Sequence, residues 1–170
     1  MKSGKNIVFL GMMGSGKTSI GFLVSKKLNL DFYDVDNYIE NKLNMKISDI
    51  FKKEGEKFFR EQEEKETLNL LKKKNIIVAL GGGAFVNKNI RNEVIKNHLS
   101  FWLKLKSDIL LKRIKNSVKR PLAINTTNNY LKNMIKDRSK FYSKALFHID
   151  CNNYTKKEIV NKILDTYENN

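Results

Sequence analysis

The sequence has one cysteine, Cys151, so no disulfide can form within the chain. This usage is typical of proteins in a reducing compartment, and we expect the protein in the cytoplasm. Long apolar runs are missing as well, because none approaches the roughly 20 residues that a membrane-spanning helix needs. Apolar residues 7–10 follow Lys2, yet no signal-peptide cleavage site of small residues comes after them. We therefore expect neither a membrane protein nor a secreted one.

Arginine is scarce and lysine abundant, since the net charge of +15 arises from 28 Lys and 5 Arg against 18 acidic residues. A charge of this size raises the question of a nucleic-acid partner. The lysines are spread over the whole chain, however, and runs such as residues 72–74 lack the interleaved aromatics of a base-stacking surface. With 21 Asn, the pattern indicates a compositional bias on solvated faces. We expect no nucleic-acid partner, although a basic surface can attract anionic substrates.

Short apolar runs alternate with helical stretches, which is typical of βαβ units and of an α/β fold with a parallel sheet. The expected strands are residues 6–10, 31–35, 75–80, 99–105 and 146–150. The expected helices are residues 17–28, most of 38–73 with breaks near Asn44 and Gly55, 108–115 capped by Ser107, and a last helix ending near Tyr167. Thr155 and Glu158 have the spacing of a capping box at the start of that last helix.

Residues 116–129 interrupt this alternation. They are polar, include the only proline, Pro121, and have no periodic apolar face. Long loops in compact domains are usually functional or disordered, so we expect a mobile loop here. No internal repeat and no linker divides the sequence, and we expect residues 1–170 to form one domain.

Residues 11–18 match the phosphate-binding motif G-x-x-x-x-G-K-[ST] in full. The alternative is a Gly-rich turn that happens to be followed by Lys-Thr. The motif follows an expected strand and opens an expected helix, and this context favours a true phosphate-binding loop. Glycines let backbone N–H groups surround phosphate oxygens, and the helix dipole favours their negative charge. We expect Lys17 to bridge the β- and γ-phosphates and the Thr18 hydroxyl to bind Mg²⁺. The motif predicts nucleotide binding but not the acceptor of the phosphoryl group.

Two carboxylates, Asp34 and Asp36, stand at the end of the second expected strand. Strand alternation would place both on one face at the carboxyl edge of the sheet, where open α/β folds bind ligands. One could hold the water shell of a metal and the other could orient a substrate hydroxyl. The alternative is that Asp36 serves as a helix N-cap, which is compatible with function.

Two further clusters are candidates for binding an acceptor. Arg60 and Glu63 are three residues apart on an expected helix, so the carboxylate can hold the guanidinium in place, although such a pair is common on surfaces. Gly81, Gly82 and Gly83 end the third expected strand. Three glycines allow close approach of a ligand to the backbone and offer N–H donors, but they also suit a simple flexible turn.

The order of these motifs resembles that of the shikimate kinases. The matching sequence letters are M-G-S-G-K-T, then D-V-D, then I-F-x-x-x-G-E-x-x-F-R-x-x-E at residues 50–63, then G-G-G, then R-P-L at residues 120–122, and then Arg138. The resemblance covers residues 6–150. It implies a nucleoside-monophosphate-kinase-like P-loop fold, a three-layer sandwich around five parallel strands in the order 2-3-1-4-5. It also implies the transfer of the γ-phosphoryl group of ATP to the 3-hydroxyl of shikimate.

The same resemblance implies roles for individual residues on the nucleotide side. Asp34 would lie near Mg²⁺ together with Thr18, and Arg113 would lie beside the nucleotide. Residues 116–129 would be the lid, carrying Arg120 to the transferring phosphate and excluding water. The phosphate-binding set implied for ATP is Gly14, Ser15, Gly16, Lys17 and Thr18.

On the acceptor side, the resemblance implies that residues 34–63 bind shikimate. Asp36 would contact the shikimate hydroxyls as the candidate base, and would be catalytic together with Lys17 and Arg120. Arg60 and Arg138 would bind the shikimate carboxylate, with the Gly82 backbone alongside. These arginines suit a prediction from composition, because a chain rich in lysine should keep arginine where a planar, bidentate donor is needed.

Two departures from the family pattern and three alternatives accompany this interpretation. Ala123 stands where the family commonly has leucine, and residues 152–155 lack a proline often seen in its adenine-binding loop. The alternatives are a gluconate kinase, a nucleotide kinase, or, from another class, a nucleic-acid-binding P-loop protein. Only the last would show a steep loss of binding with salt. We expect a monomer whose partners are the small molecules ATP and shikimate.

Overall fold

The five expected strands form one parallel sheet in a computed structural model that describes residues 4–115 and 127–169. Their bounds are Ile7–Leu10 (β1), Asp31–Asp34 (β2), Ile76–Ala79 (β3), Leu99–Lys104 (β4) and Phe147–Asp150 (β5). The strand order is β2-β3-β1-β4-β5, which confirms the order that the family resemblance implied. The central strands β1 and β3 are buried along their whole length, as expected for a sheet covered on both faces.

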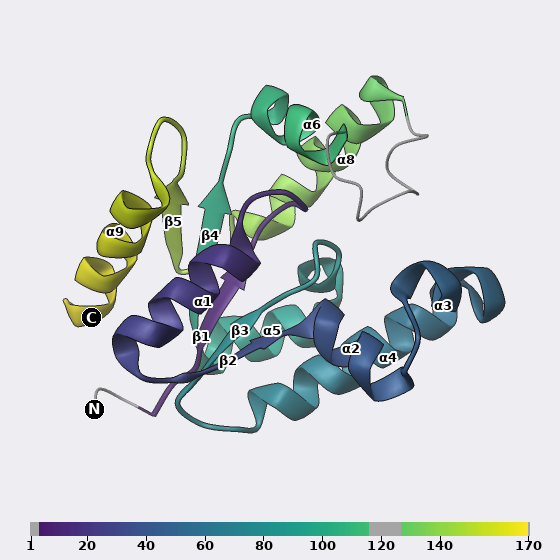
Figure 1. Cartoon of the computed structure of the whole chain (residues 1–170), viewed down its shortest axis with the longest axis horizontal. Coiled ribbons are helices and arrows are strands. Elements are labelled where there is room, and N and C mark those ends of the chain that lie inside the picture. Colours follow the sequence, from purple (N-terminus) through teal and green to yellow (C-terminus); the bar gives the residue numbers. More distant parts are fainter. Residues whose placement is uncertain (1–3, 116–126, 170) are drawn as a thin grey trace.

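Helices cover both faces of this sheet (Figure 1). Their bounds are Lys17–Leu28 (α1), Val35–Leu43 (α2), Ile47–Lys53 (α3), Gly55–Leu71 (α4), Lys88–Asn97 (α5), Ser107–Lys115 (α6), Asn128–Tyr142 (α8) and Lys156–Glu168 (α9), with a short 3-10 helix, η1, at Ala84–Val86. The connections β1–α1–β2 and β3–α5–β4 cross the sheet in opposite directions. Right-handed crossovers therefore place α1 and α5 on opposite faces, and α9 packs beside α1. No helix of the described residues is long and apolar enough to cross a membrane.

The expected interruptions near Asn44 and Gly55 are confirmed, since α2 ends before Asn44 and α4 begins at Gly55. The capping box at Thr155 and Glu158 is also confirmed. The expected cap at Ser107 is wrong by one residue, because α6 already includes Ser107 and the Lys106 carbonyl accepts the Leu110 N–H at 3.1 Å.

Helices α5 and α8 were not among the expected elements. Both are rich in polar residues, and α5 buries only Ile90 and Val94, which are four residues apart. Asparagine is a poor helix former, so these sequences lack a strong local signal. Both helices are stabilised at their first turn by a side-chain cap, from Asn87 for α5 and Thr127 for α8.

Asparagine also supplies the left-handed backbone conformations that usually favour glycine. Among the described residues, the non-glycine positions with positive φ are Asn29, Asn44, Asn75 and Asn153, with φ between 47° and 59°. Asn29 and Asn44 end α1 and α2 at the C-cap. Asparagine tolerates this region better than most residues because its short polar side chain can bond locally.

Candidate active site

The functional candidates gather at the carboxyl edge of the sheet, where β1, β2 and β3 end beside one another. Parallel strands end at the same edge, so the segments that follow them converge there. A cleft of about 400 Å³ opens at this edge, and we call it the phosphate cleft. A second hollow of about 540 Å³, the acceptor hollow, is lined by residues of α4, η1 and α8. The residues predicted from the sequence to bind nucleotide and metal line the phosphate cleft, apart from Arg120, which lies outside the described residues: Gly14, Ser15, Gly16, Lys17, Thr18, Asp34 and Arg113. Asp36, the predicted base on the acceptor side, lines this cleft too.

The loop from Gly11 to Gly16 gives the phosphate cleft its donors. Gly14 and Gly16 have φ of 80° and 97°, a conformation that side chains with a Cβ rarely adopt. Gly16 stands at the N-cap of α1 and makes no side-chain cap bond, so the start of this helix can offer N–H donors to an anion. The Ser15 hydroxyl is buried and has no hydrogen-bond partner among the described residues. A phosphate oxygen suits both these N–H groups and this hydroxyl.

Lys17 is held inside the same loop. Its ammonium donates to the carbonyls of Gly11 at 2.8 Å and Met12 at 3.1 Å, and the side chain is largely buried. Carbonyl oxygens compensate part of the cost of burying this charge. The positive charge is therefore already fixed at the phosphate cleft, as the sequence motif predicted.

Thr18 and Asp34 meet in the phosphate cleft. The Thr18 hydroxyl donates to Asp34 Oδ2 at 2.6 Å, while Asp34 Oδ1 accepts the Asn37 N–H at 3.2 Å and caps α2. The strand ends at Asp34 and Asp36 lies in the first turn of α2, so strand alternation does not relate the two carboxylates. The alternative that Asp36 caps the helix is also wrong, because Asp34 has that place.

A divalent cation would therefore meet hard oxygen donors from Thr18 and Asp34. The described residues contain no cluster of three His, Cys, Asp or Glu side chains that could hold a metal by themselves. Mg²⁺ usually keeps several waters and takes one or two protein ligands together with substrate phosphates. The donors present thus fit Mg²⁺ bound with a nucleotide better than a metal held by protein alone.

The glycine turn, residues 81–83, is surrounded by charged side chains of other elements. A Cβ on Gly81 would lie 2.5 Å from Glu63 Oε1 and 2.7 Å from Asp36 Oδ1. A Cβ on Gly83 would lie 2.7 Å from Arg60 Nη1. At these distances a Cβ would push the carboxylates or the guanidinium out of place, so glycine permits their close approach to the turn. The turn joins Asp36 of the phosphate cleft to Glu63 and Arg60 of the acceptor hollow.

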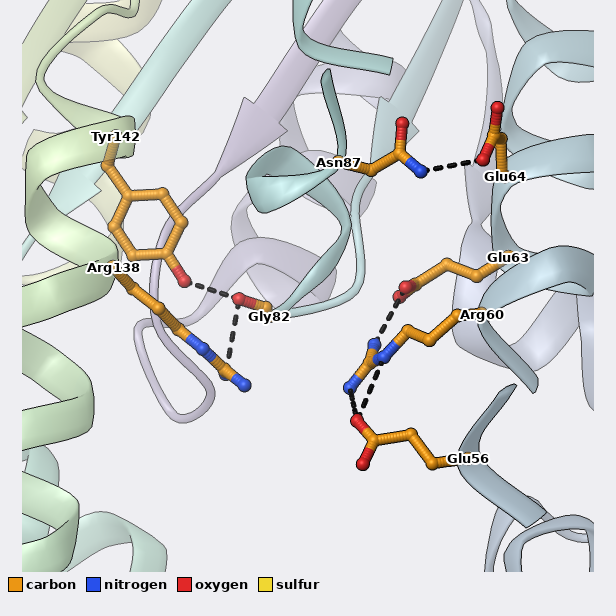
Figure 2. Close-up of polar contacts among 8 residues, drawn as sticks. All are labelled: Glu56, Arg60, Glu63, Glu64, Gly82, Asn87, Arg138 and Tyr142. Atoms are coloured by element: carbon orange, nitrogen blue, oxygen red, sulfur yellow. Dashed lines mark hydrogen bonds and ion pairs between the residues drawn. The ribbon is translucent and has the colours of Figure 1, made fainter. Parts of the chain in front are cut away.

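Arg60 is held by two glutamates on its own helix (Figure 2). Its Nη1 donates to Glu63 Oε2 at 2.7 Å, which confirms the predicted pair, and its Nε and Nη2 donate to Glu56 at 3.2 and 3.1 Å. Burial raises the pKa of the Glu63 carboxyl; Arg60 opposes this shift, and the neighbouring Asp36 charge adds to it. Arg60 presents a fixed, planar donor at the wall of the acceptor hollow.

Arg138 faces Arg60 across the acceptor hollow, on the other side of Gly82 (Figure 2). Its Nη1 donates to the Gly82 carbonyl at 3.3 Å, and the Tyr142 hydroxyl donates to the same oxygen. The sequence interpretation included Arg138 and Gly82 but not Tyr142. Its spacing of four residues from Arg138 was the available signal, because such residues share a helix face.

Two arginines remain among the described residues. Arg113 of α6 donates to the Gly14 carbonyl at 3.2 Å, so it contacts the phosphate loop directly. Arg91, which the resemblance leaves without a role, donates to the carbonyls of Phe85 and Val86 at 3.2 and 2.7 Å and stacks on Phe141 of α8. It thereby links the segment after the glycine turn to α8. Arg120 and residues 116–126 of the predicted lid lie outside the described residues.

Comparisons with known proteins agree with this geometry. A shikimate kinase family model matches residues 13–168. A shikimate kinase from Thermodesulfovibrio yellowstonii is 39% identical over 165 residues, which cover 96% of this chain and 95% of that one.

Solved structures give the same result. A shikimate kinase from Acinetobacter baumannii in complex with shikimate has a TM-score of 0.90 at 30% identity, covering 97% of this chain and 93% of that one. A shikimate kinase from Aquifex aeolicus has a TM-score of 0.86 at 32% identity, with 96% of both chains covered. The similarity extends over the phosphate loop, the glycine turn and α8, and it decides among the kinases that the motifs left open. This chain belongs to the shikimate kinase family and is an ATP-dependent kinase.

Proposed function

We propose that this enzyme transfers the γ-phosphoryl group of ATP to the 3-hydroxyl of shikimate, giving shikimate 3-phosphate and ADP, and that residues 1–170 act as one kinase domain. The observation that carries the proposal is the position of Asp36. It lines the phosphate cleft, and it lies beside Gly81 and Glu63, which border the arginines of the acceptor hollow. A hydroxyl bound at Asp36 would thus lie between a phosphate donor and two carboxylate-binding cations.

On the nucleotide side, the uncapped first turn of α1, the Ser15 hydroxyl and Lys17 would bind the ATP phosphates. Arg113 would lie beside the nucleotide, since it lines the same cleft and holds the Gly14 carbonyl. Tyr154 and Ile159 line the cleft farther along the chain and would border the base.

Magnesium would bind at Thr18 and Asp34, with the remaining ligands from water and the phosphates. When bound, it would neutralise negative charge on the β- and γ-phosphates. Asp34 keeps its second oxygen on the Asn37 N–H, and this bond fixes the carboxylate for that purpose.

On the acceptor side, Arg60 and Arg138 would bind the shikimate carboxylate from opposite sides of the glycine turn, with the Gly82 backbone alongside. Guanidinium groups suit this task because they bind carboxylates through two parallel hydrogen bonds. Asp36 would accept the proton of the attacking hydroxyl. Glu63 would hold the Arg60 guanidinium in position to bind the carboxylate of the acceptor.

Phosphoryl transfer has a loose transition state, so positioning and charge neutralisation contribute more than strong base chemistry. Lys17 would stabilise the developing charge from the loop. Arg120 would do so from the lid, and the lid would exclude water. The predicted lid, residues 116–129, is too long at its end, because Asn128 and Asn129 belong to α8. We further propose that the protein is cytoplasmic, monomeric and does not bind nucleic acid. Sedimentation at micromolar concentration, with and without added RNA, would test the monomeric state and the absence of RNA binding.

The test of function is a coupled assay of ADP release with shikimate, gluconate and nucleoside monophosphates as acceptors. Of these acceptors, we expect only shikimate to support ADP release. Asp36→Asn is the control, because it should abolish shikimate-dependent release while nucleotide binding through residues 11–18 persists. Preferred turnover of another acceptor, or full activity of Asp36→Asn, would contradict the proposal.

A further inference from the structure

The Gly82 carbonyl accepts two hydrogen bonds from neighbouring side chains of one helix. Arg138 Nη1 donates to it at 3.3 Å, and the Tyr142 hydroxyl donates to the same oxygen. The two residues are four apart on α8 and therefore lie on one face of it. Figure 2 shows both reaching from α8 toward Gly82, with Arg60 on the opposite side. A single backbone oxygen thus joins the glycine turn to α8.

The two donors differ in how firmly they are held. Tyr142 is 1% exposed and packs against Trp102 of β4, with ring centroids 6.0 Å apart. Its ring has no room to move, so the position of its hydroxyl is set by the core. Arg138 is a long side chain on the wall of the acceptor hollow, and its orientation depends on what its guanidinium contacts.

The glycine turn has no side chains to pack, and its own backbone bonds hold Gly81 and Gly83, whose carbonyls accept from the N–H groups of Ala84 at 3.1 Å and Val86 at 3.0 Å. The Gly82 carbonyl between them is held by side chains of α8 instead. A Cβ on Gly82 would lie 3.2 Å from the Met13 backbone nitrogen and 3.6 Å from Arg138 Nη1, so the turn fits closely between the phosphate loop and Arg138. Small movements of the Gly82 peptide would therefore move the acceptor for Arg138. The buried hydroxyl is the rigid contact that limits such movement.

We propose that Tyr142 is a positioning residue for acceptor binding, which acts by fixing the Gly82 carbonyl that in turn orients Arg138. It is a positioning residue and not a catalytic one, because its hydroxyl contacts the Gly82 carbonyl and the Arg138 side chain, which are themselves the groups proposed to hold the acceptor. Burial raises the pKa of Tyr142 to about 12, so the hydroxyl remains a protonated donor at neutral pH and well into the alkaline range. The inference rests on the proposed function, in which Arg138 binds the carboxylate of shikimate.

The test is Tyr142→Phe, which keeps the ring in the core and removes only the donor. We expect the KM for shikimate to rise roughly 3–12-fold, the range that the net loss of one hydrogen bond gives. The KM for ATP and kcat should stay within about twofold of wild type, since the phosphate loop is untouched. Unchanged ATP binding also shows that the variant is folded. Tyr33→Phe is the matched control. Tyr33 lies on β2, and its hydroxyl accepts a hydrogen bond from Lys73 at 3.1 Å, so this variant also loses a tyrosine hydroxyl but not one that contacts the glycine turn.

A double-mutant cycle with Arg138→Lys separates positioning from stability. If Tyr142 acts through Arg138, Tyr142→Phe should have little further effect on the KM for shikimate once Arg138 is lysine. Equal fold-changes in both backgrounds would overturn the inference, as would a lower melting temperature with an unchanged KM for shikimate. Wild-type turnover of shikimate tests the proposed function separately, whereas the ratio of variant to wild type tests only the role of Tyr142.

Discussion

The phosphate loop and the glycine turn lie at the same edge of the sheet, yet they are built in different ways. In the phosphate loop, the groups proposed to bind phosphate belong to eight consecutive residues, 11–18. They are backbone N–H groups and one lysine, which bonds to carbonyls of its own loop. The glycine turn has no side chains, and its charged neighbours come from three other elements: Asp36 of α2, Arg60 and Glu63 of α4, and Arg138 of α8.

This difference predicts how each region responds to change. In a region built from consecutive residues, a substitution should reduce activity by removing a direct contact with the ligand. An assembled structure should also lose function through residues that never touch the ligand, since each element positions the others. The following predictions test this contrast, from the largest expected effect to the smallest.

Lys17→Ala should have the largest effect. It removes the only side-chain cation within the phosphate loop, and we expect kcat to fall about 10³-fold or more, since charge stabilisation dominates phosphoryl transfer. The melting temperature should change little, because the lost hydrogen bonds go to loop carbonyls. ADP release and thermal unfolding measure the two quantities. Substantial residual turnover in a clean preparation would show that the loop does not act through Lys17.

Gly81→Ala should damage the acceptor side while sparing the nucleotide side. The new Cβ would lie 2.5 Å from Glu63 Oε1 and 2.7 Å from Asp36 Oδ1, so both carboxylates must move. We expect kcat/KM for shikimate to fall on the order of 100-fold, with an unchanged Kd for ATP by titration. Gly55→Ala is the control, because a Cβ there meets nothing within 4 Å and only backbone strain is added. A parallel loss of ATP affinity in Gly81→Ala would mean that the two regions are not separable.

Arg60→Lys should weaken shikimate binding by about 1.5–3 kcal/mol, the contribution of a charged hydrogen bond. Lysine keeps the charge but cannot bond to Glu63, Glu56 and a substrate carboxylate in one plane. Shikimate titration measures the loss, and Lys57→Arg, on the same helix, is a control for conservative exchange. Wild-type affinity in Arg60→Lys would show that charge alone suffices.

A pH effect should be the smallest and should appear only in stability. Burial raises the pKa of Tyr142 to about 12 from an ordinary 10.0, although Arg138 opposes the shift. Between these values the unfolded chain loses the phenolic proton while the folded chain keeps it, so the free energy of unfolding falls as pH rises. Tyr142→Phe should therefore lose stability less steeply with pH between 10 and 12, by denaturant titration. The same slope in both proteins would contradict this.

The sequence predicted the local region well and the assembled region in part. Residues 11–18 could be recognised because motif, strand and helix are contiguous, and the Arg60–Glu63 pair because its spacing of three is a helical contact. Asp34 and Asp36 were placed on one strand because no local signal showed that β2 ends one residue earlier. Tyr142 was missed, since its spacing of four from Arg138 indicates a shared helix face but not the contact with Gly82, which is 60 residues away and offers only a backbone oxygen.

The left-handed asparagines bear on where this chain uses glycine. Only nine glycines occur in the sequence, and six of them lie in the phosphate loop and the glycine turn, at positions 11, 14, 16, 81, 82 and 83. Elsewhere, Asn29, Asn44, Asn75 and Asn153 take over the turns where glycine is the usual choice. Arginine follows the same allocation, because all four described arginines contact the site or the segment beside it, whereas most lysines lie elsewhere and Lys17 is the one in the phosphate loop. In a chain rich in asparagine and lysine, six of the nine glycines and the four described arginines thus mark the active site and the segment beside it.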